Sequence, residues 1–161
     1  MSKKNILWAP WRIGYILNSK EKGCFLCRAL EDNQNDDKNF LLYRGQYVFV
    51  ILNLYPYNNG HILVAPNRHI KDLEDMLIEE EKEAVSLIKR SVKILKKNLK
   101  AESFNIGLNL GKAAGAGLDT HIHFHIVPRW VGDTNFIPVF TDTKVISQSL
   151  EELYIQLKKE F

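Results

Sequence analysis

Three of the chain's five histidines stand at alternate positions of one short apolar segment, "HIHFHIVPRW" (121–130). Side chains alternate between the two faces of a β-strand, so His121, His123 and His125 are predicted to share one face. A lone histidine there would most simply be a polar residue on a half-buried strand. The first and third positions lie about 13 Å apart on a strand, too far to share one metal ion easily. We therefore expect at least two roles among the three rings.

Phosphorus chemistry is one role that such a face could perform. A neutral imidazole is a competent nucleophile, provided that a hydrogen bond to its second nitrogen fixes the tautomer. A neighbouring cationic histidine and backbone N–H groups could then stabilise the phosphate oxygens. The segment "GKAAGAG" (111–117) directly precedes the histidines and has little side-chain bulk, which favours a phosphate-binding loop with Gly115 and Gly117 as contacts. Taken alone, the same loop would be read as a flexible hairpin.

The two cysteines also have a spacing typical of a site. Cys24 and Cys27 form a Cys-x2-Cys pair, which can bind one zinc ion together with two further ligands. The histidines left for this role are His61, His69 and His121. The alternatives are a redox pair, which lacks its usual βαβ context, and two buried apolar thiols. A disulfide framework is excluded by the number of cysteines.

Composition narrows the possible partners. The 161 residues carry 22 Lys and Arg against 19 Asp and Glu, a net charge of +3. This balance suits an anionic small molecule and is too weak for a typical DNA-binding surface. The sequence has no apolar segment long enough for a membrane span and no secretory signal. We expect a cytoplasmic protein that binds no DNA or membrane and needs no organic cofactor.

The hydrophobic pattern predicts a single α+β domain (1–161) built on a mainly antiparallel sheet. Two strands are expected within 40–53, with a turn at Arg44-Gly45, and a third at 61–66. An amphipathic helix is expected at 79–99. A further strand at 104–110, the histidine strand and a last helix at 147–158 complete the prediction.

The motifs together resemble those of the histidine-triad family. "HIHFHIVPR" fits the pattern His-φ-His-φ-His-φ-φ, and "NLYPYNNGHILVAPNRH" resembles the family's Gly-His signature. "LWAPWR", "FNIGLNLG" and "VPRWVGDTNF" are most similar to the branch with fragile-histidine-triad proteins and bacterial diadenosine tetraphosphate phosphorylases. The similarity runs from Leu7 to about Ile146. It implies a five-stranded antiparallel sheet, one long helix, shorter terminal helices, and a homodimer formed through the helix and the sheet edge.

The resemblance also implies roles by position. His123 matches the nucleophile that becomes linked to AMP, and His125 matches the ring that contacts the α-phosphate. His61 belongs to the same pocket. Asn109 falls where the family has an Asn or Gln near the phosphates, and Asn53 falls where a ribose contact is expected.

A structural zinc ion is implied as well. Family members with an amino-terminal Cys-x2-Cys bind one, and the matching ligands are Cys24, Cys27, His69 and His121. This would give every histidine of the chain a role and leave the first histidine of the strand outside catalysis.

The expected function is cleavage of a phosphoanhydride in a dinucleoside polyphosphate through a covalent nucleotidyl-histidine. Many relatives carry a hydroxyl residue or glutamine where this chain has Gly117 and Leu118, so a group that could orient an acceptor is missing. Lys112 and Arg129 could attract phosphate, or could be solvated surface charges. We therefore predict that hydrolysis dominates, with a phosphorylase and a nucleotide-binding signalling adaptor as alternatives.

Overall fold

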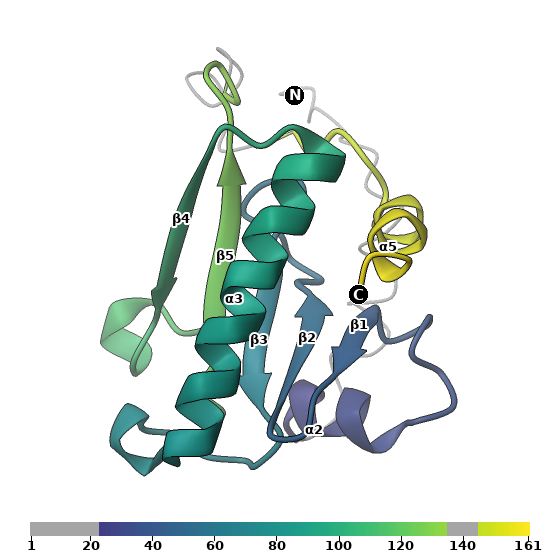
Figure 1. The fold of residues 1–161 in the computed structure, drawn as a ribbon. Coiled ribbons are helices and arrows are strands. Elements are labelled where there is room, and N and C mark those ends of the chain that lie inside the picture. The colour runs from purple at the N-terminus through teal and green to yellow at the C-terminus, as the bar shows by residue number, and fades with distance from the viewer. Residues whose placement is uncertain (1–22, 135–144) are drawn as a thin grey trace, which may run out of the picture.

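The computed structural model describes residues 23–134 and 145–161 (Figure 1). These residues contain a five-stranded sheet in the order β1-β2-β3-β5-β4, and every neighbouring pair is antiparallel. The predicted α+β class and antiparallel sheet are confirmed. The motif at 7–12 and the end of "VPRWVGDTNF" lie outside the described residues. The strands are β1 (Leu41–Arg44), β2 (Val48–Leu52), β3 (Ile62–Pro66), β4 (Ser103–Leu108) and β5 (Phe124–Arg129).

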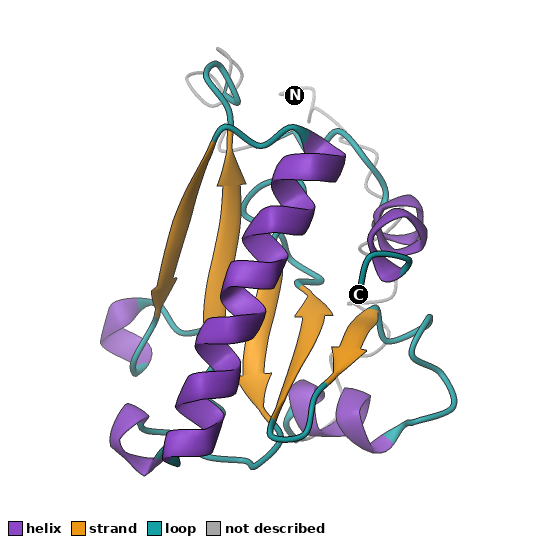
Figure 2. Cartoon of the chain, viewed as in Figure 1, coloured by secondary structure: helices purple, strands orange, loops and turns teal. Residues whose placement is uncertain are grey.

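Within the described residues, helices α2, α3 and α5 flank the sheet (Figure 2). The long helix α3 (Ile78–Leu99) crosses one face, as the periodicity predicted, and α5 (Leu150–Lys158) packs beside it and against β1. The short helix α2 (Phe25–Glu31) packs on the opposite face. The 3-10 turns η1 (Leu73–Asp75) and η2 (Lys112–Ala114) lie in the connections. In the part of the chain that the structure describes, no helix is long and apolar enough to cross a membrane.

The buried strand β2 shows that both faces of the sheet are covered. All five of its residues are buried, and they alternate between two hydrophobic clusters. Val48, Val50 and Leu52 pack with α3 and α5, whereas Phe49 and Ile51 pack with α2. Alternation is the ordinary consequence of strand geometry. The face that carries α2 also carries the histidines, because the side chain of His125 points opposite to that of the core residue Ile126.

The histidine strand starts later than the sequence predicted. β5 begins at Phe124, so His121 and His123 precede it, and its pairing with β3 ends at Val64↔Phe124. The reason lies one step further along β3, where the ring of His121 bonds the Pro66 carbonyl oxygen at 2.9 Å. The His121 side chain thus occupies a carbonyl oxygen that would accept a backbone hydrogen bond if the β3–β5 ladder were longer. Only the third histidine lies within the strand.

Two other boundaries matter for the site. β4 ends at Leu108 and not at 110, which leaves Asn109 outside the ladder. β3 begins at Ile62, so His61 stands just before it. The side chains of both residues approach His125, as described below.

Candidate active site and metal centre

His123 is held in one tautomer by the backbone. Its Nδ1 lies 2.8 Å from the carbonyl oxygen of His121, and a carbonyl can only accept a hydrogen bond. Nδ1 therefore carries the proton, and Nε2 keeps its lone pair. The side chain is buried, and its ring lies edge-on to that of His125 with centroids 4.8 Å apart. This is the arrangement expected of an imidazole nucleophile.

His61 is fixed in the opposite tautomer. The backbone N–H of Tyr57 donates to its Nδ1 at 3.0 Å, and the Asn53 amide nitrogen lies 3.2 Å from the same atom. The orientation of that amide is itself set, because its oxygen accepts from the Tyr55 N–H at 2.9 Å. Two donors therefore converge on Nδ1 of His61. In a neutral ring the proton must be on Nε2.

The tautomer of His61 determines the tautomer of His125. Nε2 of His61 lies 2.9 Å from Nδ1 of His125, so the first donates and the second accepts. The remaining nitrogen of neutral His125, Nε2, then carries a proton and can donate to a ligand. The Asn109 side-chain amide lies 3.3 Å from this nitrogen. Asn109 must turn its oxygen toward that proton or give way to a ligand oxygen.

Burial keeps these rings neutral at physiological pH. Burial, followed by the charge that His125 would carry, lowers the pKa of His61 to about 3. Burial and the neighbouring His123 lower the pKa of His125 to about 4. Burial also lowers the pKa of His123, although its bond to the His121 carbonyl opposes the shift. The site thus offers a neutral nucleophile beside a neutral N–H donor, and not beside the cationic histidine expected from the sequence.

The low pKa values of His61 and His125 make the stability of the folded protein sensitive to acid. The unfolded chain binds protons to His61 and His125 near pH 6.5, whereas the folded chain does not until about pH 4 or below. Stability should therefore fall as pH falls from 7 to 5.5, with a slope approaching about 1.4 kcal/mol per pH unit for each ring. Denaturant titrations at several pH values measure it. The double variant His61→Gln/His125→Gln should lose most of this slope, and an equal slope in that variant would contradict the assignment.

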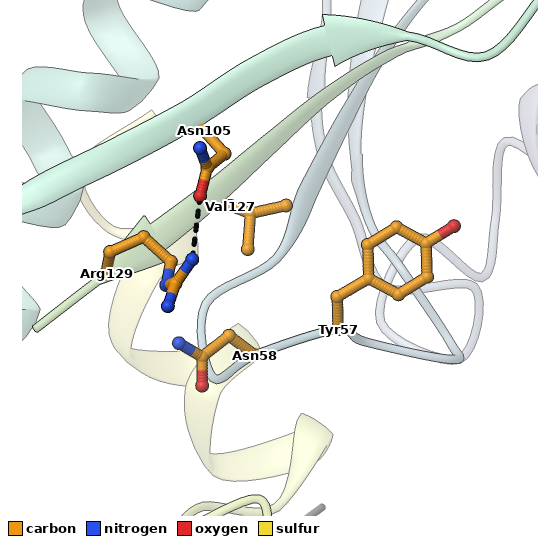
Figure 3. A pocket seen from close by; sticks show the side chains of 5 residues that line it. All are labelled: Tyr57, Asn58, Asn105, Val127 and Arg129. Atoms are coloured by element: carbon orange, nitrogen blue, oxygen red, sulfur yellow. Dashed lines mark hydrogen bonds between the residues drawn. The ribbon is translucent and has the colours of Figure 1, made fainter. Parts of the chain in front are cut away.

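A small pocket lies beside His125, and Figure 3 shows the side chains that line it. The ring of Tyr57 stacks on His125 with centroids 5.5 Å apart and planes at 20°. The same ring forms one wall of a cavity of about 250 Å³. The lining residues are Tyr57, Asn58, Asn105, Val127 and Arg129. Sequence reasoning missed this pocket, because its walls come from a loop and two strands that no shared motif connects.

The glycine loop differs from the expected cradle. The N–H of Gly115 bonds the Lys112 carbonyl, and two neighbouring N–H groups bond Gly111, so three donors are used within the loop. Gly115 has a φ of +86°, which indicates a role in shaping the turn. Gly117 has open space around it. Leu118 packs on the α2 side of the sheet, which anchors the end of the loop there.

The two cations that could attract phosphate differ in their surroundings. Lys112 is almost fully exposed, with Asp119 at 3.9 Å. Arg129 makes two hydrogen bonds to Asp133, one of 2.6 Å, and a third to Asn105. The charge of Arg129 is therefore balanced by a buried carboxylate. Of these two, only Lys112 offers a largely uncompensated charge.

The four predicted metal ligands come together on the α2 side of the sheet. Cys24 precedes α2, Cys27 lies in its first turn, and both approach the two histidines. One ligand atom from each residue lies within 4.8 Å of the other three. Sγ of Cys24 is 3.3 Å from Nδ1 of His121, and Sγ of Cys27 is 3.2 Å from Nδ1 of His69 and 3.5 Å from that of His121.

These distances fit a tetrahedral ion. Zinc bonds of about 2.3 Å to sulfur and 2.0 Å to nitrogen give a sulfur–nitrogen edge of about 3.5 Å. The second nitrogen of His121 donates to the Pro66 carbonyl, which directs Nδ1 toward the cysteines. Metal-binding histidines usually have such a partner. The donor set and its outer hydrogen bond therefore fit zinc.

The family follows from a comparison with known proteins. The HIT domain model matches residues 34–131, which include the histidine segment and the Gly-His signature. The chain belongs to the HIT domain family. Its resemblance to the histidine-triad family is thereby confirmed.

Individual HIT relatives extend over most of the chain. An "AP-4-A phosphorylase" of Mycobacterium tuberculosis is 37% identical over 91% of this chain and 78% of its own. A "Bis(5'-adenosyl)-triphosphatase" of Saccharomyces cerevisiae is 31% identical over 58% of this chain and 47% of its own. A zinc-bound histidine triad family protein from Mycobacterium smegmatis superposes with a TM-score of 0.69 at 27% identity, covering 86% of this chain and 92% of that one.

Proposed function

We propose that this HIT chain cleaves a phosphoanhydride of dinucleoside polyphosphates through a nucleotidyl group held on His123. The observation that carries the proposal is the pairing of tautomers: a lone pair on Nε2 of His123 stands beside a proton on Nε2 of His125. A nucleophile and a donor are the two groups that transfer of a nucleotidyl group requires. The names of the relatives, a phosphorylase and a triphosphatase of adenosine dinucleotides, support the substrate class.

The first step follows from these positions. Nε2 of His123 forms a bond to the α-phosphorus, and the bond from that phosphorus to the bridging oxygen breaks. The Nε2 proton of His125 bonds the phosphate oxygens as charge develops on them. Asn109, displaced from His125, can bond the same phosphate. His61 acts through His125 and not on the phosphate, because its Nε2–H donates to Nδ1 of His125.

We also propose that the four-residue cluster binds a structural zinc ion. Cys24, Cys27, His69 and His121 fit its geometry, and the mycobacterial structure is described as zinc-bound. The ion would cross-link α2 to the segments that follow β3 and precede β5. Because the His121 carbonyl accepts the proton of His123, this link also steadies the orientation of the nucleophile.

The acceptor of the nucleotidyl group separates two candidate activities. The sequence predicts water, since Gly117 and Leu118 offer no hydroxyl to orient an anion. The Mycobacterium tuberculosis relative, named a phosphorylase, favours inorganic phosphate, and the exposed charge of Lys112 is consistent with it. We propose phosphate as the preferred acceptor and water as the slower one.

Product analysis distinguishes the acceptors. With diadenosine tetraphosphate and phosphate in the millimolar range, we expect ATP and ADP as the main products. Without phosphate we expect ATP and AMP at a much lower rate. Chromatographic separation of the nucleotides provides the readout, and His123→Ala protein serves as the blank. Equal rates under both conditions, with AMP as the product throughout, would restore the hydrolase assignment made from the sequence.

A homodimer in the cytoplasm completes the proposal. Val85 on α3 and Ile106 on β4 are about half exposed, at 56% and 47%. In the described sheet β4 pairs only with β5, so its outer edge remains available for a second copy. An exposed strand edge with apolar neighbours is normally covered.

A nucleotide-binding adaptor remains the alternative of another class, and slow turnover without any histidine adduct would favour it.

A further inference from the structure

The pocket beside His125 has a composition that selects neutral, flat groups. Val127 forms its floor, the half-exposed ring of Tyr57 forms one wall, and Asn105 with Arg129 forms the other (Figure 3). Amide and guanidinium groups donate hydrogen bonds in the plane of a bound ring, whereas tyrosine and valine contact its faces. This combination is the one that binds a nucleobase or its ribose.

The charges around the pocket exclude a phosphate as its natural occupant. Arg129 is 2.6 Å from a carboxylate oxygen of Asp133, and that carboxylate is 95% buried behind it. The pair is therefore neutral overall, and its carboxylate would repel an anion. The same carboxylate accepts from Asn58, which also donates to the Pro128 carbonyl and so fixes the loop that carries Tyr57. The loop that carries Tyr57 is thus attached to the end of β5 through Asn58.

The position of the pocket matches the direction in which a leaving group departs. Nucleophile and leaving oxygen lie roughly in line through phosphorus, so the leaving chain departs on the side away from His123. Along the strand, His123 is followed by His125 and then by Val127, about 7 Å further on. A polyphosphate that passes the N–H of His125 is therefore directed toward the pocket.

We infer that the Tyr57–Asn105–Arg129 pocket binds the second nucleoside of a dinucleoside polyphosphate, the one that departs with the leaving phosphates. The inference rests on the proposed function for the identity of the first half of the substrate. It makes the pocket the element that distinguishes dinucleotides from mononucleotides of equal charge. Stacking of a base on an aromatic side chain typically strengthens binding by about ten-fold or more.

Binding to His123→Ala protein tests the inference without turnover. The two ligands are diadenosine tetraphosphate and adenosine 5'-tetraphosphate, which share the first nucleoside and all four phosphates. We expect the dinucleotide to bind at least about ten-fold more tightly. Calorimetric titration gives both dissociation constants, and their ratio is the readout. A global change in folding or in phosphate binding affects both ligands and leaves the ratio unchanged.

Variants locate the effect in the pocket. Tyr57→Leu and Asn105→Leu should bring the ratio close to one, from opposite walls. Tyr57→Phe should retain it, because the hydroxyl points away from the pocket (Figure 3). Tyr55→Leu, which changes the other half-exposed tyrosine of the same loop, should also retain it.

Three results would overturn the inference. Equal affinities of the two ligands for His123→Ala protein, with both displaced by AMP, would remove the second subsite and leave the proposed function intact. A ratio that persists in both leucine variants would place the second nucleoside elsewhere. If neither ligand binds, the inference and the proposed function fail together.

Discussion

The variant His123→Ala should lose the cleavage of diadenosine tetraphosphate by about 10⁴-fold or more in kcat, as when the nucleophile of other covalent enzymes is removed. The expectation rests on Nε2 of His123, which has a lone pair because its partner nitrogen donates to the His121 carbonyl. Nucleotide affinity should change little, since a nucleophile contributes mainly to the transition state. Steady-state rates and a binding titration measure the two effects separately.

Two variants of the neighbouring ring serve as a graded control. His125→Ala removes the N–H that faces the phosphate, whereas His125→Gln retains an N–H donor in a side chain of similar reach. Both should be slower than the natural protein but faster than His123→Ala, with the glutamine variant the faster of the two. Cleavage by His123→Ala at a rate near that of the natural protein would refute the role of this residue.

Zinc removal has the second large expected effect, and it falls on stability. The ion would hold α2 to two loops through Cys24, Cys27, His69 and His121, and structural zinc sites contribute strongly to folding. Loss of several kcal/mol would lower the melting temperature by about 10 °C or more in a chain of this size. Metal analysis should find about one zinc ion per chain, and chelation followed by thermal unfolding should show the shift.

The control for chelation is a protein without the thiol ligands. Cys24→Ser/Cys27→Ser should unfold at a temperature similar to that of the chelated natural protein, and chelator should change it no further. In both proteins the melting temperature should fall more than the activity measured at moderate temperature. A natural protein that contains no metal and a Cys24–Cys27 disulfide would contradict the zinc assignment.

Much of the fold was predictable because its signals are local. The helix at 78–99 differs by one residue from the predicted start, since its apolar face repeats over many turns. The turn after Arg44 follows from glycine in the sequence. The start of β5 was predicted wrongly, because the alternation of His121 and His123 continues beyond the ladder. Only the long-range bond from His121 to Pro66 reveals where the pairing ends.

The site likewise has features that the sequence predicts and features that depend on long-range contacts. Residue types and spacing brought His123, His125 and the cysteine pair to attention, and the family resemblance then selected His69 and His121 as partners of the cysteines. The structure places each group together. The expected ribose contact of Asn53 stays a prediction, but both ends of its amide already bond Tyr55 and His61. Alternation in a sequence cannot show which ring nitrogen carries a proton. That information came from backbone donors and acceptors that only the folded chain brings into range.

The most direct test of the covalent mechanism is to find the intermediate itself. Protein mixed briefly with diadenosine tetraphosphate without added phosphate, quenched and digested, can be analysed by mass spectrometry under conditions that preserve a phosphorus–nitrogen bond. We predict one AMP per modified chain, attached to His123, and its disappearance when phosphate is added before quenching, with ADP formed in its place. Turnover of the substrate without any such adduct, or an adduct on a different residue, would contradict the mechanism.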